Sequence, residues 1–192
     1  MAKVDKIEVQ KKVTKVAMEM ILQFGLRGLN MLELARASGL AKATLYKIIG
    51  TKEDLVREIA FQIFHKNIIK ILEPFKLTDD PLQATQQFVD NYLSYGLVGQ
   101  RILIQQIYKE YPLIEKGIEE KYKYEISNLH KKYVDWQDRG LIRQDINVEY
   151  CIDALQNLND IYLTYQYSDE ETIDRLRTII RCVFSGMGIP VK

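Results

Sequence analysis

The spacing of apolar residues constrains the fold of this chain more than any other feature. Apolar side chains recur every three or four positions through most of the 192 residues, as in the run Val13, Val16, Met20 and Phe24. This spacing places them on one face of an α-helix. No convincing run alternates apolar and polar residues as a strand would, and no internal repeat is evident. The pattern predicts an all-α protein of about nine helices.

Glycine, proline and capping residues divide the periodic segments into helices. Asn30, Thr51, Asp80 and Ser168 each stand just before such a segment, where a side-chain oxygen can accept hydrogen bonds from the first free N–H groups of a helix. Pro74 ends one segment, because proline cannot continue a helix. Helices are expected near residues 13–25, 31–38, 41–49, 52–73, 81–97, 102–108, 112–139, 148–165 and 169–183.

The charge of the chain is distributed unevenly, although its net value is only +1. Residues 1–52 contain ten Lys or Arg and four Asp or Glu, a net charge of +6, and residues 53–192 contain seventeen and twenty-two, a net charge of −5. A basic head on an acidic body is typical of nucleic-acid-binding proteins, although chance variation of surface charge produces the same asymmetry. The division predicts a nucleic-acid-binding domain at residues 1–52 and a separate body at residues 53–192.

Several functional classes lack the residues that they need. The N-terminus is too polar for a signal peptide, and no apolar run approaches the ~18 residues of a membrane span, so a soluble cytoplasmic protein is expected. Cys151 and Cys182 are too few for a disulfide framework and should pack as small apolar residues. His65 and His130 lie apart from any ligand cluster, so no metal is expected. The sequence has no nucleophile–base pair and no phosphate loop, so neither an enzymatic activity nor a cofactor is expected.

Residues 30–55, NMLELARASGLAKATLYKIIGTKEDL, carry the most informative pattern. Two short predicted helices are joined by a turn at Gly39 and preceded by a third helix, which is the arrangement of a helix-turn-helix unit. Leu34 can pack on the following helix, and the small side chain of Ala35 allows a close approach. A winged-helix regulator would need a strand hairpin after this unit, but residues 51–72 have helical spacing.

The second helix of this unit has two different faces. Because successive residues turn by about 100°, Leu45, Ile48 and Ile49 share one face and should be buried. The outward side carries small and polar residues that suit a DNA major groove: Lys42, Ala43, Thr44, Tyr46 and Lys47. Ala43 could touch a thymine methyl and Lys47 could donate to guanine O6 and N7. The alternative is an ordinary amphipathic helix with a solvated face.

Residues in and after this helix follow an order found in one family. A stretch of glycine, leucine, lysine, threonine, leucine and tyrosine is followed by Lys-Glu and a leucine, at positions Gly39, Leu40, Lys42, Thr44, Leu45, Tyr46, Lys52, Glu53 and Leu55. Over residues 10–60 the chain resembles the DNA-binding motif of the tetracycline-repressor (TetR) family of transcriptional regulators. The resemblance implies that Tyr46 and Lys52 bind phosphate, and Asn30 is also placed for a phosphate contact.

Three residues depart from the family pattern. Ala41 stands where the family usually has a capping serine, so the third helix should begin without a side-chain cap, at a local cost of about 1 kcal/mol. Ile49 replaces an aromatic residue and keeps its position apolar. Ala43 replaces a common glycine, a change that bears on base preference. None of the three removes the DNA-binding chemistry.

The resemblance implies that the last two helices pair with those of a second copy in a four-helix dimer interface. The penultimate helix is apolar on two faces, whereas a monomer would need only one. One face carries Cys151, Ala154, Leu158 and Ile161, and the other carries Ile152, Leu155 and Tyr162. The alternative is a helix that is simply central in the body.

The resemblance also implies an effector pocket among the middle helices. The chain has 12 Tyr and 6 Phe, and polar side chains occur within apolar helices; a few directed polar groups in an apolar cavity are typical of small-molecule sites. The predicted lining residues are Tyr92, Gln105, Tyr108, Asn157 and Tyr162. The alternative is that these aromatic residues belong to the core.

The sequence therefore predicts a ligand-responsive transcriptional regulator, a repressor that binds an inverted-repeat DNA operator as a homodimer and is released by a small-molecule effector. The helix-turn-helix head would span residues 1–52, and the effector-binding and dimerisation body residues 53–192. The alternative is an all-helical protein–protein interaction module with a non-functional DNA-binding head.

Overall fold

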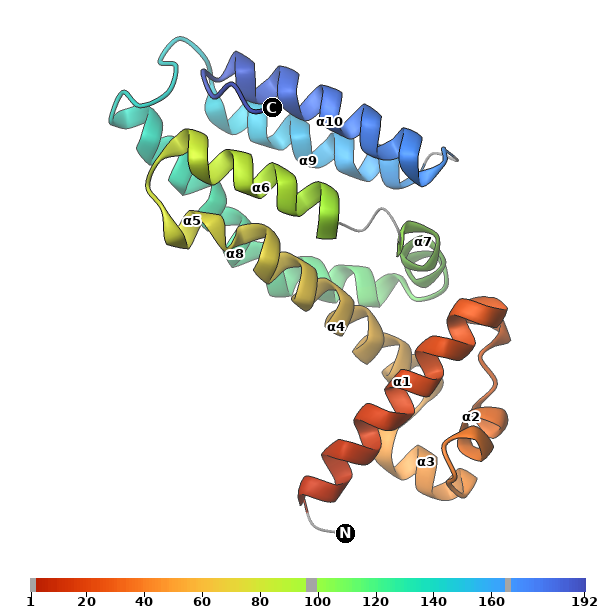
Figure 1. Ribbon diagram of the computed structural model, residues 1–192. Coiled ribbons are helices and arrows are strands. Elements are labelled where there is room, and N and C mark those ends of the chain that lie inside the picture. The colour runs from red at the N-terminus through yellow and green to blue at the C-terminus, as the bar shows by residue number, and fades with distance from the viewer. Residues whose placement is uncertain (1–2, 96–99, 165–166) are drawn as a thin grey trace. The chain divides into compact units, whose positions relative to one another are not determined.

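The computed structural model describes residues 3–95, 100–164 and 167–192, and in these ranges it contains helices and no strands. The all-α prediction is confirmed. In chain order (Figure 1) the helices are α1 Lys3–Gly28, α2 Met31–Ala37, α3 Lys42–Ile49, α4 Lys52–Leu72, α5 Pro74–Leu77, α6 Pro81–Tyr95, α7 Arg101–Glu110, α8 Pro112–Asp138, α9 Val148–Thr164 and α10 Asp169–Gly186.

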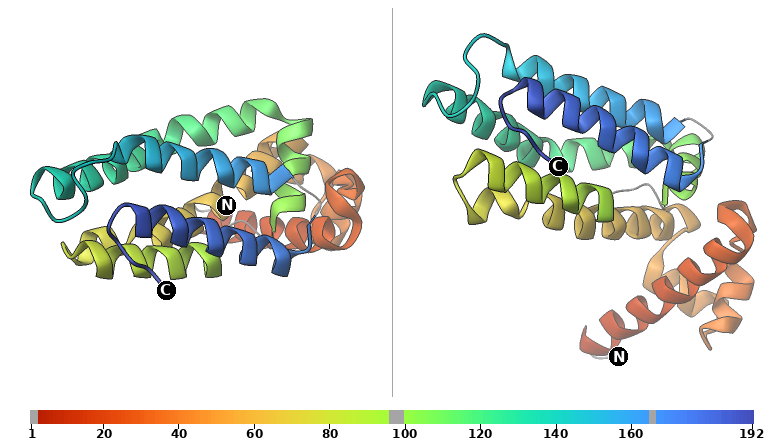
Figure 2. Two further views of the ribbon diagram at one scale, coloured as in Figure 1. Left: turned by 90° about the horizontal axis from the view of Figure 1, so that it is seen from above. Right: turned by 45° about the horizontal axis from the view of Figure 1, so that its top comes forward.

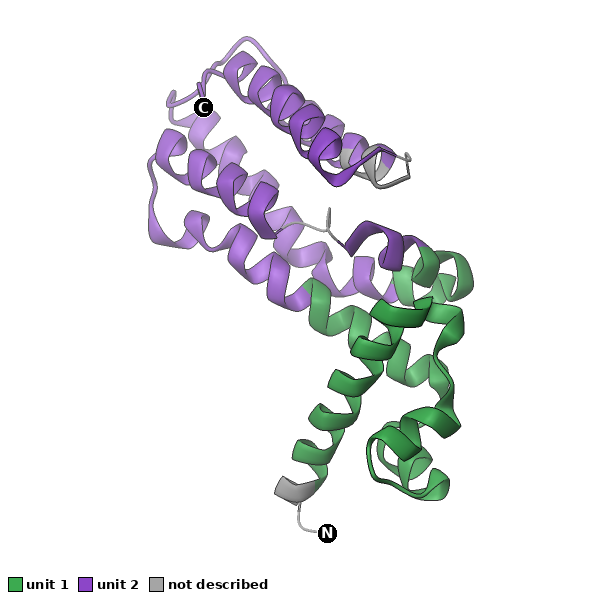
Figure 3. Cartoon of the chain, turned by 45° about the vertical axis from the view of Figure 1, so that its right-hand side comes forward, with its two compact units in different colours: residues 1–64, 106–116 green, residues 65–105, 117–192 purple. Residues whose placement is uncertain are grey.

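The chain forms two compact units, shown in two colours in Figure 3. Unit 1 comprises residues 1–64 and 106–116, and unit 2 comprises residues 65–105 and 117–192. The division falls inside α4, α7 and α8, so each of these three helices belongs to both units.

In unit 1 the helices α1, α2 and α3 each contact the other two. Their apolar faces meet in a core that includes the fully buried side chains of Val13, Leu34 and Leu45. α1 is interrupted at Gly25, whose φ of 74° is a conformation that glycine adopts at little cost, and a short further turn reaches Gly28. The helix end that was predicted at Gly25 coincides with this break.

Unit 2 is built around paired helices. α9 and α10 lie side by side in both views of Figure 2, and α6 contacts both α5 and α10. Aromatic rings fill the centre: the Tyr133 ring lies 5.2 Å from the Trp136 ring, 5.6 Å from that of Phe75 and 5.8 Å from that of Phe184, between centroids. Tyr133 is fully buried, so desolvation raises the pKa of its hydroxyl group, whose oxygen lies 3.0 Å from Thr85 Oγ1.

Asp79 ties the segment between α5 and α6 to the end of α8. Its carboxylate accepts hydrogen bonds from Lys132 Nζ at 2.5 Å, from Trp136 Nε1 at 3.1 Å and from Arg139 Nη2 at 2.6 Å. The bonds from Arg139, Lys132 and Trp136 hold the pKa of Asp79 well below its usual range. Two residues 53 and 60 positions further along the chain are thereby fixed to one short loop.

Helix boundaries agree with the capping residues, with one addition. Ser168 Oγ accepts from Glu171 N, and Asp80 Oδ1 accepts from Gln83 N, as caps should. Pro74 ends α4 as predicted but also occupies the first turn of α5, where its missing N–H costs nothing. The structure therefore has ten helices in its described part, one more than the number expected. In that part no helix is long and apolar enough to cross a membrane.

Candidate nucleic-acid interface

The start of α2 is fixed by its predicted cap. Asn30 Oδ1 accepts hydrogen bonds from Leu32 N at 2.8 Å and from Glu33 N at 3.3 Å. The Asn30 side chain stays exposed while it caps. The positive end of the helix dipole lies at this exposed residue, and an anion there would be stabilised by it.

α3 divides into the two faces that the sequence predicts. Leu45 and Ile49 are buried and Ile48 is half-buried. On the other side, Thr44 is half-buried and four side chains are exposed: Lys42, Ala43, Tyr46 and Lys47. The ammonium of Lys42 lies 6.0 Å from the Tyr46 ring centroid, so the two side chains form one basic and aromatic surface.

The first turn of α3 has no side-chain cap, as the alanine at position 41 predicts. Ala41 has an extended backbone and makes no capping hydrogen bond. The first N–H groups of α3 are therefore available to another acceptor, and a phosphate oxygen is one that suits them.

The turn between α3 and α4 is held by a reciprocal capping arrangement. Asp54 N donates to Thr51 Oγ1 at 3.1 Å, while Asp54 Oδ2 accepts from Thr51 N at 2.9 Å and from Thr51 Oγ1 at 2.7 Å. The backbone bond from Thr51 is the main cause that lowers the pKa of Asp54, and Arg57 adds to it. Lys52, half-buried, is the first residue of the helix that this arrangement positions.

Gly50 makes this arrangement fit. Its φ is 73°, and a Cβ built on it would lie 2.6 Å from Asp54 Oδ2. A Cβ at this position would force the Asp54 carboxylate to shift, and the positive φ also favours glycine at this turn. The Thr51-x-x-Asp54 spacing is a readable signature of such a cap, although only the role of Thr51 was anticipated from it.

Three further contacts in unit 1 were not expected. Lys12 Nζ donates to the Ser38 carbonyl oxygen at 3.4 Å and so joins α1 to the turn between α2 and α3. Arg57 pairs with Glu53 at 2.8 Å and Asp54 at 3.1 Å, which neutralises part of the acidic start of α4. The first contact joins residues 26 positions apart, and no local pattern announces it.

All seven predicted DNA-contacting residues lie in unit 1, on the beginnings of α2, α3 and α4 and along α3. These three helix starts and the exposed face of α3 provide lysine ammonium, tyrosine hydroxyl and backbone N–H donors. They can contact phosphates and the edges of bases.

The predicted effector-lining residues are not assembled in the same way. Tyr92 stacks on Phe88 at 6.1 Å beside the core of unit 2, and Tyr108 stacks on Phe64 at 6.2 Å in unit 1. Gln105 is half-buried. Asn157 is exposed, and its Nδ2 donates to the Asp153 carbonyl oxygen. The side chain of Tyr162 lies outside the described residues.

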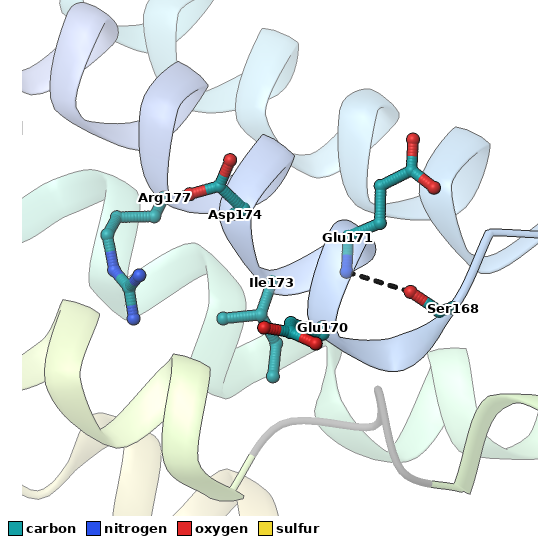
Figure 4. Close-up of a pocket in the computed structure, with 6 residues that line it drawn as sticks. All are labelled: Ser168, Glu170, Glu171, Ile173, Asp174 and Arg177. Atoms are coloured by element: carbon teal, nitrogen blue, oxygen red, sulfur yellow. Dashed lines mark hydrogen bonds between the residues drawn. The ribbon is translucent and has the colours of Figure 1, made fainter.

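Two open hollows of unit 2 are lined by other residues. One follows the start of α10 and is lined by Ser168, Glu170, Glu171, Ile173, Asp174 and Arg177 (Figure 4). The second lies along α8 and includes His130, whose Nε2 is 3.0 Å from Gln156 Nε2. Neither is lined by a predicted effector residue. Among the described residues no group of three or more His, Cys, Asp or Glu could hold a metal ion.

Comparison with known protein families gives a match for the N-terminal part of the chain. Residues 13–59 match the family model of bacterial regulatory proteins, tetR family, about a quarter of the chain. No curated protein matches the chain significantly.

Solved structures resemble the chain over nearly its whole length. A TetR transcription regulator from Haloarcula marismortui ATCC 43049 has 14% identity and a TM-score of 0.75, covering 96% of this chain and 99% of that one. The fatty acid degradation regulator of Bacillus halodurans has 15% identity and a TM-score of 0.70, with 93% and 96% covered. The ketosteroid transcriptional regulator of Mycobacterium tuberculosis has 17% identity and a TM-score of 0.63, with 93% and 94% covered.

These matches are to transcription regulators, in agreement with the expectation that the chain is not an enzyme. At such identities the structural likeness shows the fold, and the head supplies the family signature. Residues 13–59 thus carry the signature of the tetR family of bacterial regulatory proteins, and the chain has the fold of solved tetR-type regulators over nearly its whole length.

Proposed function

We propose that the chain is a ligand-responsive repressor that binds an inverted-repeat operator in duplex DNA as a homodimer. The observation that carries the proposal is the exposed face of α3, with Ala43 and Lys47 at its centre, in a unit that matches the tetR family. A cytoplasmic location follows from this role, because the operator is DNA.

In the proposed complex, some residues of the head would contact bases and others would contact phosphates. Lys47 would donate to guanine and Ala43 would touch a thymine methyl, with Lys42 and Thr44 beside them. Tyr46, Lys52 and Asn30 would hold the phosphates on either side. These contacts belong to a DNA-binding domain at residues 1–52, and residues 53–192 would sense the effector and form the dimer.

The proposed dimer would use α9 and α10. The face of α9 with Ile152 and Leu155 packs in the core of unit 2. On the other face Cys151 packs against the same core, Leu158 is half-buried, and Ala154 and Ile161 are exposed, the latter by 45%. A second copy would bury this face and so place two heads on one DNA.

The proposed effector is a bulky, largely uncharged ligand. Two similar structures are named for fatty acid degradation and for ketosteroids, both with apolar carbon skeletons. The half-buried Tyr92, Gln105 and Tyr108 could offer an apolar surface with a few polar groups. Asn157 and Tyr162 remain candidates on α9.

Selection of duplexes from a random pool by the purified protein tests the proposal. We expect an inverted repeat with half-site centres one helical turn apart, ~34 Å, or a multiple of that distance. Binding should weaken steeply as salt rises, because phosphate contacts release counterions. Recovery of no palindromic sequence, with binding that ignores salt, would leave a protein–protein interaction module with a non-functional head as the better account.

A further inference from the structure

Half of the positive charges of the head lie on the first half of α1, outside the proposed DNA contacts. Five of the ten lysines and arginines of residues 1–52 occur at positions 3–15. Only three of the other five, Lys42, Lys47 and Lys52, belong to the proposed interface. The basic character of the head therefore depends on α1 as much as on the rest of the head.

Residues 3–12 of α1, which we call the leading segment, extend beyond the core of unit 1. Val13 is fully buried, whereas the side chains of residues 6–12 are exposed or half-buried. Ten residues of α-helix span about 15 Å. The bond from Lys12 Nζ to the Ser38 carbonyl oxygen holds the end of this segment beside the turn that precedes α3. In Figure 1 and in the right-hand view of Figure 2, the leading segment and α3 lie at the same end of unit 1.

Lys6 lies on the side of the leading segment that continues the packed face of α1. Because seven residues turn by about 700°, Lys6 is only about 20° from Val13 around the helix. Val13 and Ala17 on this face are fully buried in the core of unit 1, but Lys6, two turns earlier, is exposed. Glu8 lies on the opposite side of the helix, about 160° from Lys6. The face directed to the same side as α2 and α3 is therefore cationic at this level.

We propose that the leading segment of α1 is a further DNA-binding element, in which the ammonium of Lys6 pairs with a backbone phosphate beside the site contacted by α3. A lysine ammonium is a compact charge on a flexible stem and suits a phosphate oxygen. Such a contact fixes the position of the head on the duplex and carries no sequence information. The inference rests on the proposed function, because it adds one contact to the same DNA.

Lys6→Ala tests the contact through its dependence on salt. The probes are the inverted repeat recovered by selection with the wild-type protein and a random duplex of the same length. Loss of one phosphate contact should weaken binding to both duplexes by about the same factor, and should lower the slope of log affinity against log salt by about one. The base preference recovered by selection should stay that of the wild type.

A matched control lies on the same helix. Lys15 is also exposed, and nine residues after Lys6 it lies about 180° away around α1. Lys15→Ala removes the same charge on the side turned away from the core, so its salt slope should equal that of the wild type. Both changes place alanine, the best helix former, at an exposed position, and the urea midpoints should be unchanged. Equal losses of slope for the two variants would show an effect of net charge alone and would overturn the proposal.

Ethylation interference locates the phosphate on the DNA. Ethylation removes the negative charge of a phosphate, so each phosphate that the wild-type protein contacts should weaken binding when it is ethylated. At one phosphate of each half-site this effect should disappear for Lys6→Ala and persist for Lys15→Ala. If every phosphate keeps its effect in Lys6→Ala, the proposed contact is wrong and the proposed function stands. A wild-type protein that binds no duplex would refute the proposed function itself.

Discussion

At the scale of single residues, we propose different roles for a lysine on the exposed side of α3 and for a lysine at the start of α4. Lys47 lies at the centre of the exposed face, whereas Lys52 is the first residue of α4. A contact to a base edge depends on sequence and a contact to phosphate does not. Replacement of each of the two lysines should therefore affect DNA binding in a different way.

Replacing each lysine by alanine separates the two tasks. Lys47→Ala should cost about 1–3 kcal/mol on the selected operator and relax preference at one base pair. Lys52→Ala should weaken all sequences alike and lower the slope of log affinity against log salt by about one. Titrations of operator and random duplex at several salt concentrations measure both effects. Equal losses for Lys47→Ala on the two duplexes would show that it contacts phosphate only.

Gly50 should tolerate no side chain. Gly50→Ala forces a positive φ on alanine, at a cost of about 1–3 kcal/mol, and moves the Asp54 carboxylate that caps α4. We expect a lower urea midpoint and weaker DNA binding, because Lys52 begins the same helix. Gly186→Ala is the control, since a Cβ at that position meets nothing within 4 Å. If both variants unfold at the wild-type midpoint, the turn is not constrained as the geometry indicates.

The hydrogen bonds that Asp79 accepts from Lys132, Trp136 and Arg139 should make the stability of the fold decrease at acid pH. The lowered pKa of Asp79 means that its carboxylate stabilises the fold above the usual aspartate value, about 3.9, and that this contribution is lost as pH falls through the lower folded value. Thermal unfolding from pH 7 to pH 2 should show a steeper acid loss for wild type than for Asp79→Asn. Parallel curves would show that solvent screens the cluster completely.

Local patterns account for most of what could be predicted at this scale. The caps at Asn30, Thr51 and Ser168 act within three residues of themselves, so a short stretch of sequence contains them. The bonds from Lys12 to Ser38 and from Lys132 to Asp79 join distant positions, and they exist only because whole helices pack together. Helical periodicity describes spacing within one helix, so it cannot predict such pairs between distant positions.

At the scale of elements, α9 carries a prediction about assembly. Ala154 is an exposed residue of α9, on the face proposed for the dimer. Ala154→Arg would place a charge in the proposed interface, and the protein should become monomeric by light scattering and lose most of its operator affinity. Gln87→Arg, on the exposed side of α6, adds the same charge elsewhere and should remain dimeric. A dimeric Ala154→Arg protein would move the interface to another surface.

Element boundaries show where periodicity stops being informative. The two faces of α3 follow directly from 100° steps, and burial confirms them. α5 was missed because its four residues are fewer than the two turns that a periodic pattern needs. The seven proposed DNA contacts lie within 23 consecutive residues, 30–52, so the sequence could group them; the proposed effector residues are spread over α6, α7 and α9, and their grouping depends on packing.

At the scale of the whole molecule, the proposed regulation is a linkage between two binding equilibria, that of DNA and that of an effector. If an effector weakens DNA binding, DNA must weaken effector binding by the same factor, typically 5–150-fold. Apolar and aromatic metabolites that raise the melting temperature should therefore bind less tightly when the operator is present. A hit with the same affinity in both titrations would bind without regulating the head.

The aromatic residues show why the effector site is harder to read than the head. Phe75, Phe88, Tyr133 and Phe184 contact one another within the core of unit 2. A buried aromatic ring has the same sequence signature whether it fills a core or lines a pocket. Composition could predict an apolar body, but only packing shows that Tyr92 lies against this core and that Tyr108 stacks on Phe64 in unit 1.

The burial of Trp136 has a practical consequence. It is the only tryptophan in the sequence, it is fully buried in unit 2, and its indole N–H bonds to Asp79. Its fluorescence emission therefore reports on unit 2, whereas far-ultraviolet circular dichroism sums the helices of both units. Along one urea titration, coincident curves would mean a single cooperative transition, and separated curves would mean that the units melt independently. The chain contains its own fluorophore for dissecting the stability of one unit without a label.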